Sequence, residues 1–161
     1  MFALSKKNLF KVVFLISLIA LLFAYFVEFA LGHQPCNLCL LERVPYFLSI
    51  IIVLINYKYK MFENYLILLL SIIFLAATLL SLYHLGIEEG FFQESLICAV
   101  DKGYIILDKD EILKQLQQKI ISCKDVTFKI FGLSLTSYNI IINLLLCAYS
   151  TNIYFKNEKN R

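Results

Sequence analysis

Charged residues are scarce in this sequence. Asp, Glu, Lys and Arg make up 17% of its 161 residues, against roughly 25% in a typical soluble domain. Hydrophobic residues reach 60%, and a core that apolar would leave too little polar surface for solubility. The scarcity of charge therefore excludes an ordinary soluble domain and predicts that the surplus apolar surface faces lipid. The sequence also has no internal repeat and no low-complexity tract, so we expect one membrane domain over residues 1–161.

Four apolar runs predict four membrane-spanning helices, because a spanning helix needs about 20 mostly apolar residues. The runs cover about residues 12–32, 39–57, 65–83 and 133–155, and they leave external loops at about 33–38 and 84–131. We therefore predict an all-α membrane protein, a four-transmembrane-helix bundle. In the second loop, apolar residues recur at helical spacing, which predicts a short amphipathic helix over about 110–121.

The distribution of basic residues predicts the orientation. An even number of spans puts both termini on one side of the membrane, and lysines and arginines gather on the cytoplasmic side. The basic residues of the two tails and of the turn between spans two and three are Lys6, Lys7, Lys11, Lys58, Lys60, Lys156, Lys159 and Arg161. We expect cytoplasmic termini and external cysteine loops. The net charge of +3 follows from this topology, so we expect no nucleic-acid partner.

One alternative treats the first run as a cleaved signal peptide. Lys6 and Lys7 precede a long apolar stretch, as they would in such a segment. The stretch is longer than usual for a signal peptide, and Glu28 stands where a small neutral residue is expected. Cleavage would leave both cysteine loops on the same side of the membrane.

Four of the five cysteines fall in the external loops or, for Cys39, at the edge of one. Cys36 and Cys39 form a C-x-x-C pair at the first loop, whereas Cys98 and Cys123 lie in the second, and Cys147 is alone inside the fourth run. Disulfides persist outside the cytoplasm, so the cysteine positions agree with the charge-based topology. The short spacing of the first pair favours a reactive, exchangeable disulfide. Two purely structural disulfides are the alternative.

A metal site is a further alternative for the C-x-x-C pair. A zinc site would require a second close cysteine pair or a histidine pair. Cys98 and Cys123 are far apart in the sequence, and His33 and His84 are single histidines. The spacing therefore predicts no metal. Asn139 and Asn143, one helical turn apart, are expected to form hydrogen bonds between helices.

The second span gives a sharper prediction. It must begin close to Cys39, because otherwise it is too short to cross the bilayer. This start places the Cys39 thiol at a helix N-terminus, where the dipole favours thiolate. Arg43 follows four residues later on the same face and would stabilise the thiolate, whereas Pro45 should bend the helix. We hypothesise that Cys39 passes electrons to a quinone in the lipid, and that Glu28 either pairs with Arg43 or reaches the headgroups.

The sequence resembles the bacterial disulfide bond formation protein B (DsbB) family over nearly its whole length. The resemblance rests on CNLCLLERVPY at residues 36–46, YHLGIE at 83–88, Cys98, Cys123, and FGLSL at 131–135 with Tyr138-Asn139. It implies a multi-pass protein of the bacterial inner membrane, with periplasmic cysteine loops, that reoxidises a DsbA-like periplasmic thiol oxidase.

The resemblance also implies an electron path. The partner's cysteine would attack a Cys98–Cys123 disulfide that is accessible to a soluble protein, forming a mixed disulfide through Cys98. Cys123 would then exchange with the Cys36–Cys39 pair. Cys39 would end as the thiolate that faces ubiquinone or menaquinone. Arg43 would polarise the quinone.

His33 and His84 are the remaining candidates for contact with the quinone, because ionisable groups at membrane level often mark sites. Two other functions stay open. A quinone reductase of the vitamin K epoxide reductase type also joins a C-x-x-C pair to a loop pair, but in the reverse order along the chain. A membrane protein with structural disulfides and no enzymatic activity is the other.

Overall fold

The computed structural model describes residues 6–59, 62–93, 98, 122–124, 128–130 and 132–159. In chain order, the elements are α1 (Lys6–Tyr25), a π-helical turn η1 (Phe26–Ala30), α2 (Asn37–Leu41), α3 (Val44–Lys58), α4 (Glu63–Glu88), β1 (Lys129–Ile130), β2 (Leu133–Ser134) and α6 (Leu135–Lys159). The two strands form an antiparallel hairpin in which Lys129 pairs with Ser134. The described part of the chain is therefore almost entirely helical.

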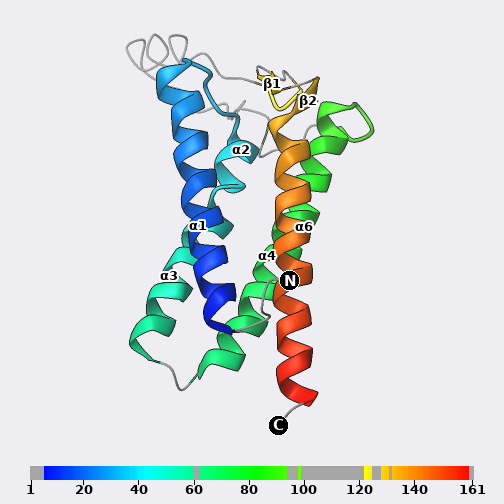
Figure 1. Ribbon diagram of the computed structural model, residues 1–161. Coiled ribbons are helices and arrows are strands. Elements are labelled where there is room, and N and C mark those ends of the chain that lie inside the picture. The colour runs from blue at the N-terminus through cyan, green and yellow to red at the C-terminus, as the bar shows by residue number, and fades with distance from the viewer. Residues whose placement is uncertain are drawn as a thin grey trace, which may run out of the picture.

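The long helices form an elongated bundle (Figure 1). The most extensive packing joins α4 to α6, and α3 packs against both α1 and α4. Figure 1 shows α2, the hairpin, η1 and the end of α4 at the upper end, whereas the ends of α3 and α6 lie at the lower end. The cysteine of α2 therefore lies at the upper end of the bundle, opposite the ends of α3 and α6.

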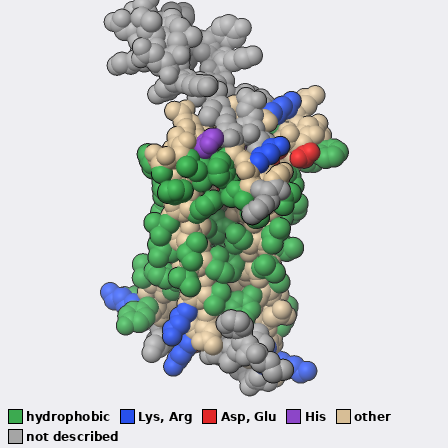
Figure 2. Space-filling model, turned by 45° about the horizontal axis from the view of Figure 1, so that its top comes forward, with side chains coloured by type: hydrophobic (Ala, Val, Ile, Leu, Met, Phe, Trp, Pro, Cys, Tyr) green, Lys and Arg blue, Asp and Glu red, His purple; other side chains and the backbone are tan. Residues whose placement is uncertain are grey.

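The surface of the bundle is apolar around its middle. Large hydrophobic side chains such as Leu22, Leu79 and Leu145 are more than half exposed, while Phe74, Leu70 and other core residues are fully buried. Figure 2 shows hydrophobic side chains over the middle of the visible face, with lysine and arginine side chains toward the ends. An exposed apolar band of this kind is what lipid contact requires.

Among the described residues, three helical stretches are long and apolar enough to cross a membrane: Lys6–Ala30, Asn37–Lys58 and Glu63–Glu88. They correspond to the first three predicted spans. The fourth predicted span coincides with α6, which has 25 residues but also carries many polar side chains. Thr136, Asn143 and Ser150 of α6 are buried in the protein, so α6 is a packed fourth helix, and its crossing of a membrane stays a prediction.

The boundaries of the first two spans differ from the prediction. Helix α1 begins at Lys6 rather than near residue 12, and the helical stretch ends at Ala30, before Gly32 takes a φ of 71°. The second stretch is broken into α2 and α3. Pro45 explains the break, because a proline has no N–H for the carbonyl of Leu41 and its ring clashes with that carbonyl. The amphipathic helix predicted over about 110–121 lies outside the described residues.

Candidate functional site

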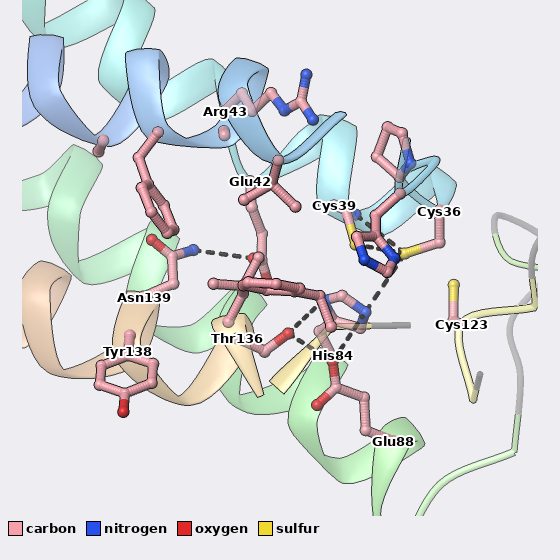
Figure 3. Close-up of a pocket in the computed structure, with 18 of the residues that line it drawn as sticks. Cys36, Cys39, Glu42, Arg43, His84, Glu88, Cys123, Thr136, Tyr138 and Asn139 are labelled. Atoms are coloured by element: carbon pink, nitrogen blue, oxygen red, sulfur yellow. Dashed lines mark hydrogen bonds and ion pairs between the residues drawn. The ribbon is translucent and has the colours of Figure 1, made fainter. Parts of the chain in front are cut away.

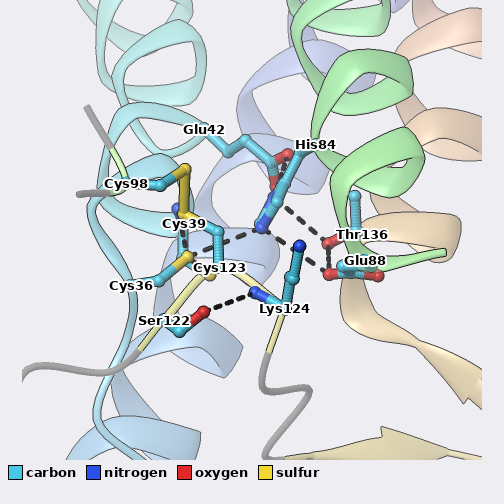
Figure 4. The surroundings of a disulfide bond; sticks show 10 residues. All are labelled: Cys36, Cys39, Glu42, His84, Glu88, Cys98, Ser122, Cys123, Lys124 and Thr136. Carbon is cyan, nitrogen blue, oxygen red and sulfur yellow. Dashed lines mark hydrogen bonds and ion pairs between the residues drawn. A yellow bond between two sulfur atoms is a disulfide. The ribbon is translucent and has the colours of Figure 1, made fainter. Parts of the chain in front are cut away.

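The four loop cysteines lie together at the upper end of the bundle. A disulfide joins Cys98 to Cys123, with a Cα–Cα distance of 5.6 Å, and this disulfide forms one buried cluster with Cys36, Leu38 and Ile87. Figure 4 shows the disulfide beside the C-x-x-C pair. The exposed fractions of Cys98 and Cys123 are only 4% and 3%. The expectation that this pair is open to a soluble protein is therefore wrong for this structure.

Cys36 caps the N-terminus of α2. Its backbone is extended, and its Sγ accepts a hydrogen bond from the Cys39 backbone N–H at 3.3 Å. The Cys39 Sγ lies 2.8 Å from the Cys36 Sγ. The hydrogen bond from the Cys39 thiol, assisted by His84, outweighs burial and lowers the pKa of Cys36 from 9.0 to about 4. The helix begins at Asn37, so Cys39 lies in its first turn, which agrees with the predicted start close to Cys39, and Cys36 occupies the N-cap position.

His84 connects the thiols to two carboxylates. It comes from the last turns of α4 and is 1% exposed. Its Nδ1 lies 2.9 Å from Oε1 of Glu42, and its Nε2 lies 3.5 Å from the Cys36 Sγ. Oε1 of Glu88 is 3.6 Å from the same Nε2 and accepts a hydrogen bond from the Thr136 hydroxyl at 2.6 Å. Figure 3 shows His84 between these groups.

A polar network extends from Glu42 into the bundle. The Asn139 amide donates to Oε2 of Glu42 and to the Ser81 hydroxyl, each at 2.9 Å. Oδ1 of Asn139 accepts hydrogen bonds from the Tyr46 hydroxyl and from the Asn143 amide. Asn139 therefore links α6 to α4 and to the α2–α3 segment, which confirms the predicted hydrogen bonds between helices for Asn139, whereas the Asn143 amide donates to Asn139 within α6.

Arg43 forms an ion pair with η1. The guanidinium points toward η1, where its Nη1 lies 2.5 Å from Oε2 of Glu28. The guanidinium also lies 4.9 Å from the centre of the Tyr25 ring. Cys39 and Arg43 border the same cavity, and the predicted pair between Glu28 and Arg43 is confirmed.

A cavity of about 350 Å³ borders these groups. Its lining includes Cys36, Cys39 and Cys123, together with Arg43, His33 and His84, so all the predicted site residues except Cys98 meet at one space. The ring of His33 packs against Phe128, with 5.2 Å between ring centres. Apolar residues of α1, including Ala20 and Ala24, form another part of the wall.

Comparison with models of known protein families shows which family the chain belongs to. The family model "Disulfide bond formation protein DsbB" matches residues 6–153. The chain belongs to the DsbB family. It is also 35% identical over 166 residues to an uncharacterized protein of Rickettsia prowazekii (strain Madrid E). The aligned region covers 97% of this chain and 94% of the Rickettsia protein. No solved structure matches the chain.

Membership of the DsbB family implies a membrane protein with disulfide oxidase activity. The three helices that are long and apolar enough to cross a membrane agree with this class. The match favours this family over the vitamin K epoxide reductase type. The buried cluster supplies two cysteine pairs in contact, which is the arrangement that thiol–disulfide exchange requires.

Glu42 and Thr136 belong to the site but were not among the predicted site residues. A signal for Glu42 was present, because an acid inside an apolar run is expensive in a membrane and usually has a partner or a function. The partner, His84, is 42 residues away in the chain, so spacing alone could not identify it. Thr136 has no comparable signal, since one threonine near a helix start is ordinary.

Proposed function

We propose that this DsbB-family protein is a quinone-dependent thiol oxidase of the bacterial inner membrane. It takes two electrons from a DsbA-like periplasmic dithiol protein by disulfide exchange and passes them to a membrane quinone. The observation that carries the proposal is the shared position of the cavity and the cysteines. Cys36, Cys39 and Cys123 all border one cavity, and the Cys98–Cys123 disulfide packs against Cys36.

The exchange steps proceed in a fixed order. A thiolate of the partner attacks Cys98, forming a mixed disulfide and releasing the Cys123 thiolate. Cys123 then attacks Cys36 of an oxidised Cys36–Cys39 pair, and Cys39 leaves as thiolate. The second partner thiol next displaces Cys98, which attacks Cys123 and releases Cys36. The partner ends as a disulfide, and two electrons rest on Cys36 and Cys39.

The structure is consistent with the final state of this sequence, with a Cys98–Cys123 disulfide and free Cys36 and Cys39. The contact of Cys36 with the loop pair supports Cys36 as the sulfur that exchanges with Cys123. Cys39 is less buried than Cys36 and also lines the cavity. This difference supports Cys39 as the sulfur that faces the electron acceptor. Because Cys98 and Cys123 are buried, the partner must uncover them when it docks.

The residues of the cavity fit a quinone ring. A bound quinone supplies a two-electron acceptor that becomes a quinol when it takes up two electrons and two protons. A volume of about 350 Å³ is within the usual range for small-molecule sites, roughly 300–1,000 Å³. The α1 wall is apolar, and Arg43 offers N–H donors for a carbonyl oxygen, since a guanidinium has five and Glu28 does not use them all. Glu28 holds Arg43 at the cavity wall. His33 and His84 are further candidates for quinone contact.

The proposed topology has four spans, with periplasmic cysteines and cytoplasmic termini. Lys58 ends α3 and Lys156 lies in the last turn of α6, at the end of the bundle opposite the cysteines. Lys6 begins α1 at the same end as Glu63, with which it pairs at 3.8 Å. Basic residues on the cytoplasmic side are the expected pattern.

An anaerobic quinone-reduction assay tests the proposal. The purified full chain is mixed with a reduced DsbA-like protein and with ubiquinone or menaquinone analogues. Wild type and Cys147→Ser should reduce quinone at similar rates, because Cys147 lies outside the cysteine cluster. Cys39→Ser should abolish reduction, and Arg43→Ala should raise the KM for quinone. Absence of turnover with either quinone type would refute the proposal and leave two structural disulfides.

A trapping experiment tests the partner step separately. Replacing Cys123 by Ser removes the cysteine that re-forms the loop disulfide, so a mixed disulfide between Cys98 and the partner should accumulate. Cys98→Ser is the matched control and should trap nothing through the loop pair. Equal trapping by both variants would contradict the assignment of Cys98 as the attacked sulfur.

A further inference from the structure

The structure brings together three side chains that can bind a metal. One ligand atom from each of Cys36, Cys39 and His84 lies within 4.8 Å of the others. Figure 4 shows the two sulfurs and the imidazole at the end of α4. The sequence predicted no metal because each histidine is single, but packing supplies the third ligand from a helix far along the chain. Two cysteines and a histidine are a common donor set for zinc.

The imidazole of His84 is already oriented for this role. Its Nδ1 is 2.9 Å from Oε1 of Glu42, so Nδ1 can donate its N–H to that carboxylate, and Nε2 can bind a metal once any proton on it has left. Nε2 is the ring nitrogen on the thiol side, 3.5 Å from the Cys36 Sγ. A histidine that binds metal usually donates its other ring N–H to a carboxylate in this way.

Glu88 gives a second, independent indication that these groups suit a cation. Its side chain is 7% exposed, and its Oε1 lies 3.6 Å from Nε2 of His84. Its Oε2 is buried and has no hydrogen-bond partner within the described residues. A buried carboxylate oxygen without a partner is unfavourable, and a cation held between the thiolates and His84 would satisfy it. Glu88 therefore adds negative charge beside the three ligands.

We propose that the reduced protein binds a thiophilic divalent cation, with zinc as the best match, through Cys36, Cys39 and His84, next to the buried carboxylate of Glu88. Binding releases to solvent the proton that lies between the two sulfurs and any proton on Nε2 of His84, forms two metal–sulfur bonds and one metal–nitrogen bond, and transfers no electron. The two sulfurs move apart from their present 2.8 Å to accommodate the ion. A Cys36–Cys39 disulfide has no thiolate to offer, so only the reduced state binds.

A functional consequence rests on the proposed thiol-oxidase activity. A metal that holds both thiolates blocks formation of the Cys36–Cys39 disulfide, so zinc should inhibit turnover reversibly. Binding itself does not depend on that activity and can be measured without quinone or partner protein. Failure of one proposal is therefore distinguishable from failure of the other.

Cobalt titration of the full-length protein in detergent tests the site. Co²⁺ at a zinc site with thiolate ligands gives visible absorption and a thiolate-to-cobalt charge-transfer band. We expect both signals in the reduced wild type and neither in the protein with an intact Cys36–Cys39 disulfide. This comparison requires no variant and therefore no assumption about folding. Added Zn²⁺ should displace the cobalt and protect Cys36 and Cys39 from alkylation.

Variants then assign the ligands. A Cys98→Ser/Cys123→Ser double variant should keep the cobalt signals, because the C-x-x-C pair alone supplies the sulfur. Cys147→Ser is the matched thiol control and should bind like wild type. His84→Gln should weaken binding by more than tenfold, and Glu42→Gln, which changes only the orienting carboxylate, by about 10–100-fold.

Three results would overturn the proposal. The first is a reduced wild type without a charge-transfer band. The second is equal cobalt binding by the reduced and the oxidised protein. The third is wild-type affinity in a His84→Gln variant whose circular dichroism spectrum is unchanged.

Discussion

The acidity of Cys36 leads to a prediction that can be worked out in numbers. Its pKa is lowered from 9.0 to about 4, and the hydrogen bond from the Cys39 thiol is the largest cause. At pH 6 a thiol with a pKa of about 4 is roughly 99% thiolate, whereas one with an ordinary pKa is roughly 0.1% thiolate. Intrinsic nucleophilicity falls with pKa at a slope of about 0.4–0.5, so the thousandfold gain shrinks to roughly 3–10-fold in rate.

The midpoint of the pH–rate profile is therefore a better measurement than the absolute rate. Reduced protein is treated briefly with iodoacetamide at a series of pH values, in the presence of a chelator. Mass spectrometry then quantifies modified Cys36, and a small-molecule thiol in the same tube calibrates the reagent. The rate for wild-type Cys36 should rise through pH 4 and reach a plateau by about pH 6, because the lowered pKa favours thiolate at all higher pH values.

Two variants of Cys39 test the cause of the shift. Cys39→Ala removes the thiol donor and should move the Cys36 midpoint upward, toward 9. Cys39→Ser keeps a donating hydroxyl at the same position and should move the midpoint less. Both variants keep the backbone N–H of residue 39 and the contact with His84. A wild-type midpoint near 9, or an identical midpoint in wild type and Cys39→Ala, would refute the reasoning.

Three further predictions follow from the hydrogen bonds and ion pairs. Glu28→Gln weakens the anchor of Arg43, so the quinone KM should rise several-fold while kcat changes by less than roughly twofold; an unchanged KM would contradict this role. Asn139→Ala leaves Glu42 and Tyr46 without their partner and should destabilise the protein by about 2–3 kcal/mol, measured by thermal unfolding in detergent. Ser17→Ala removes a buried 2.7 Å contact with Ser49 and should cost about 1 kcal/mol; a loss as large as that of Asn139→Ala would contradict the ranking.

Composition and the apolar runs were sufficient to predict a helical membrane protein, because the length and the charge of an apolar run are properties of a local segment. The break between α2 and α3 was harder to predict. Pro45 was expected to bend one helix, but the structure begins a new helix at Val44 and places the proline in its first turn. The partner of Arg43 is Glu28, one of the two positions that the sequence had left open for this acid.

The contacts at the site depend on residues that are far apart in the chain. His84 meets Cys36 and Glu42 only because α4 packs beside the α2–α3 segment. The burial of Cys98 and Cys123 depends in the same way on contact with Cys36 and Ile87. A single sequence can name such residues as candidates, but it does not contain the packing that joins them.

The polarity of α6 has a consequence for how the protein is assembled. An isolated helix with Asn139, Asn143, Thr136 and Ser150 would enter lipid poorly, since each unsatisfied polar group is expensive there. In the proposed four-span arrangement α6 is synthesised last, after its partners on α4 and α3 are already in the bilayer. Ser81 and Glu42 can then receive the Asn139 amide as the helix arrives. We therefore expect α6 to insert efficiently only behind α4, and a fusion that carries α6 alone should remain largely outside the membrane.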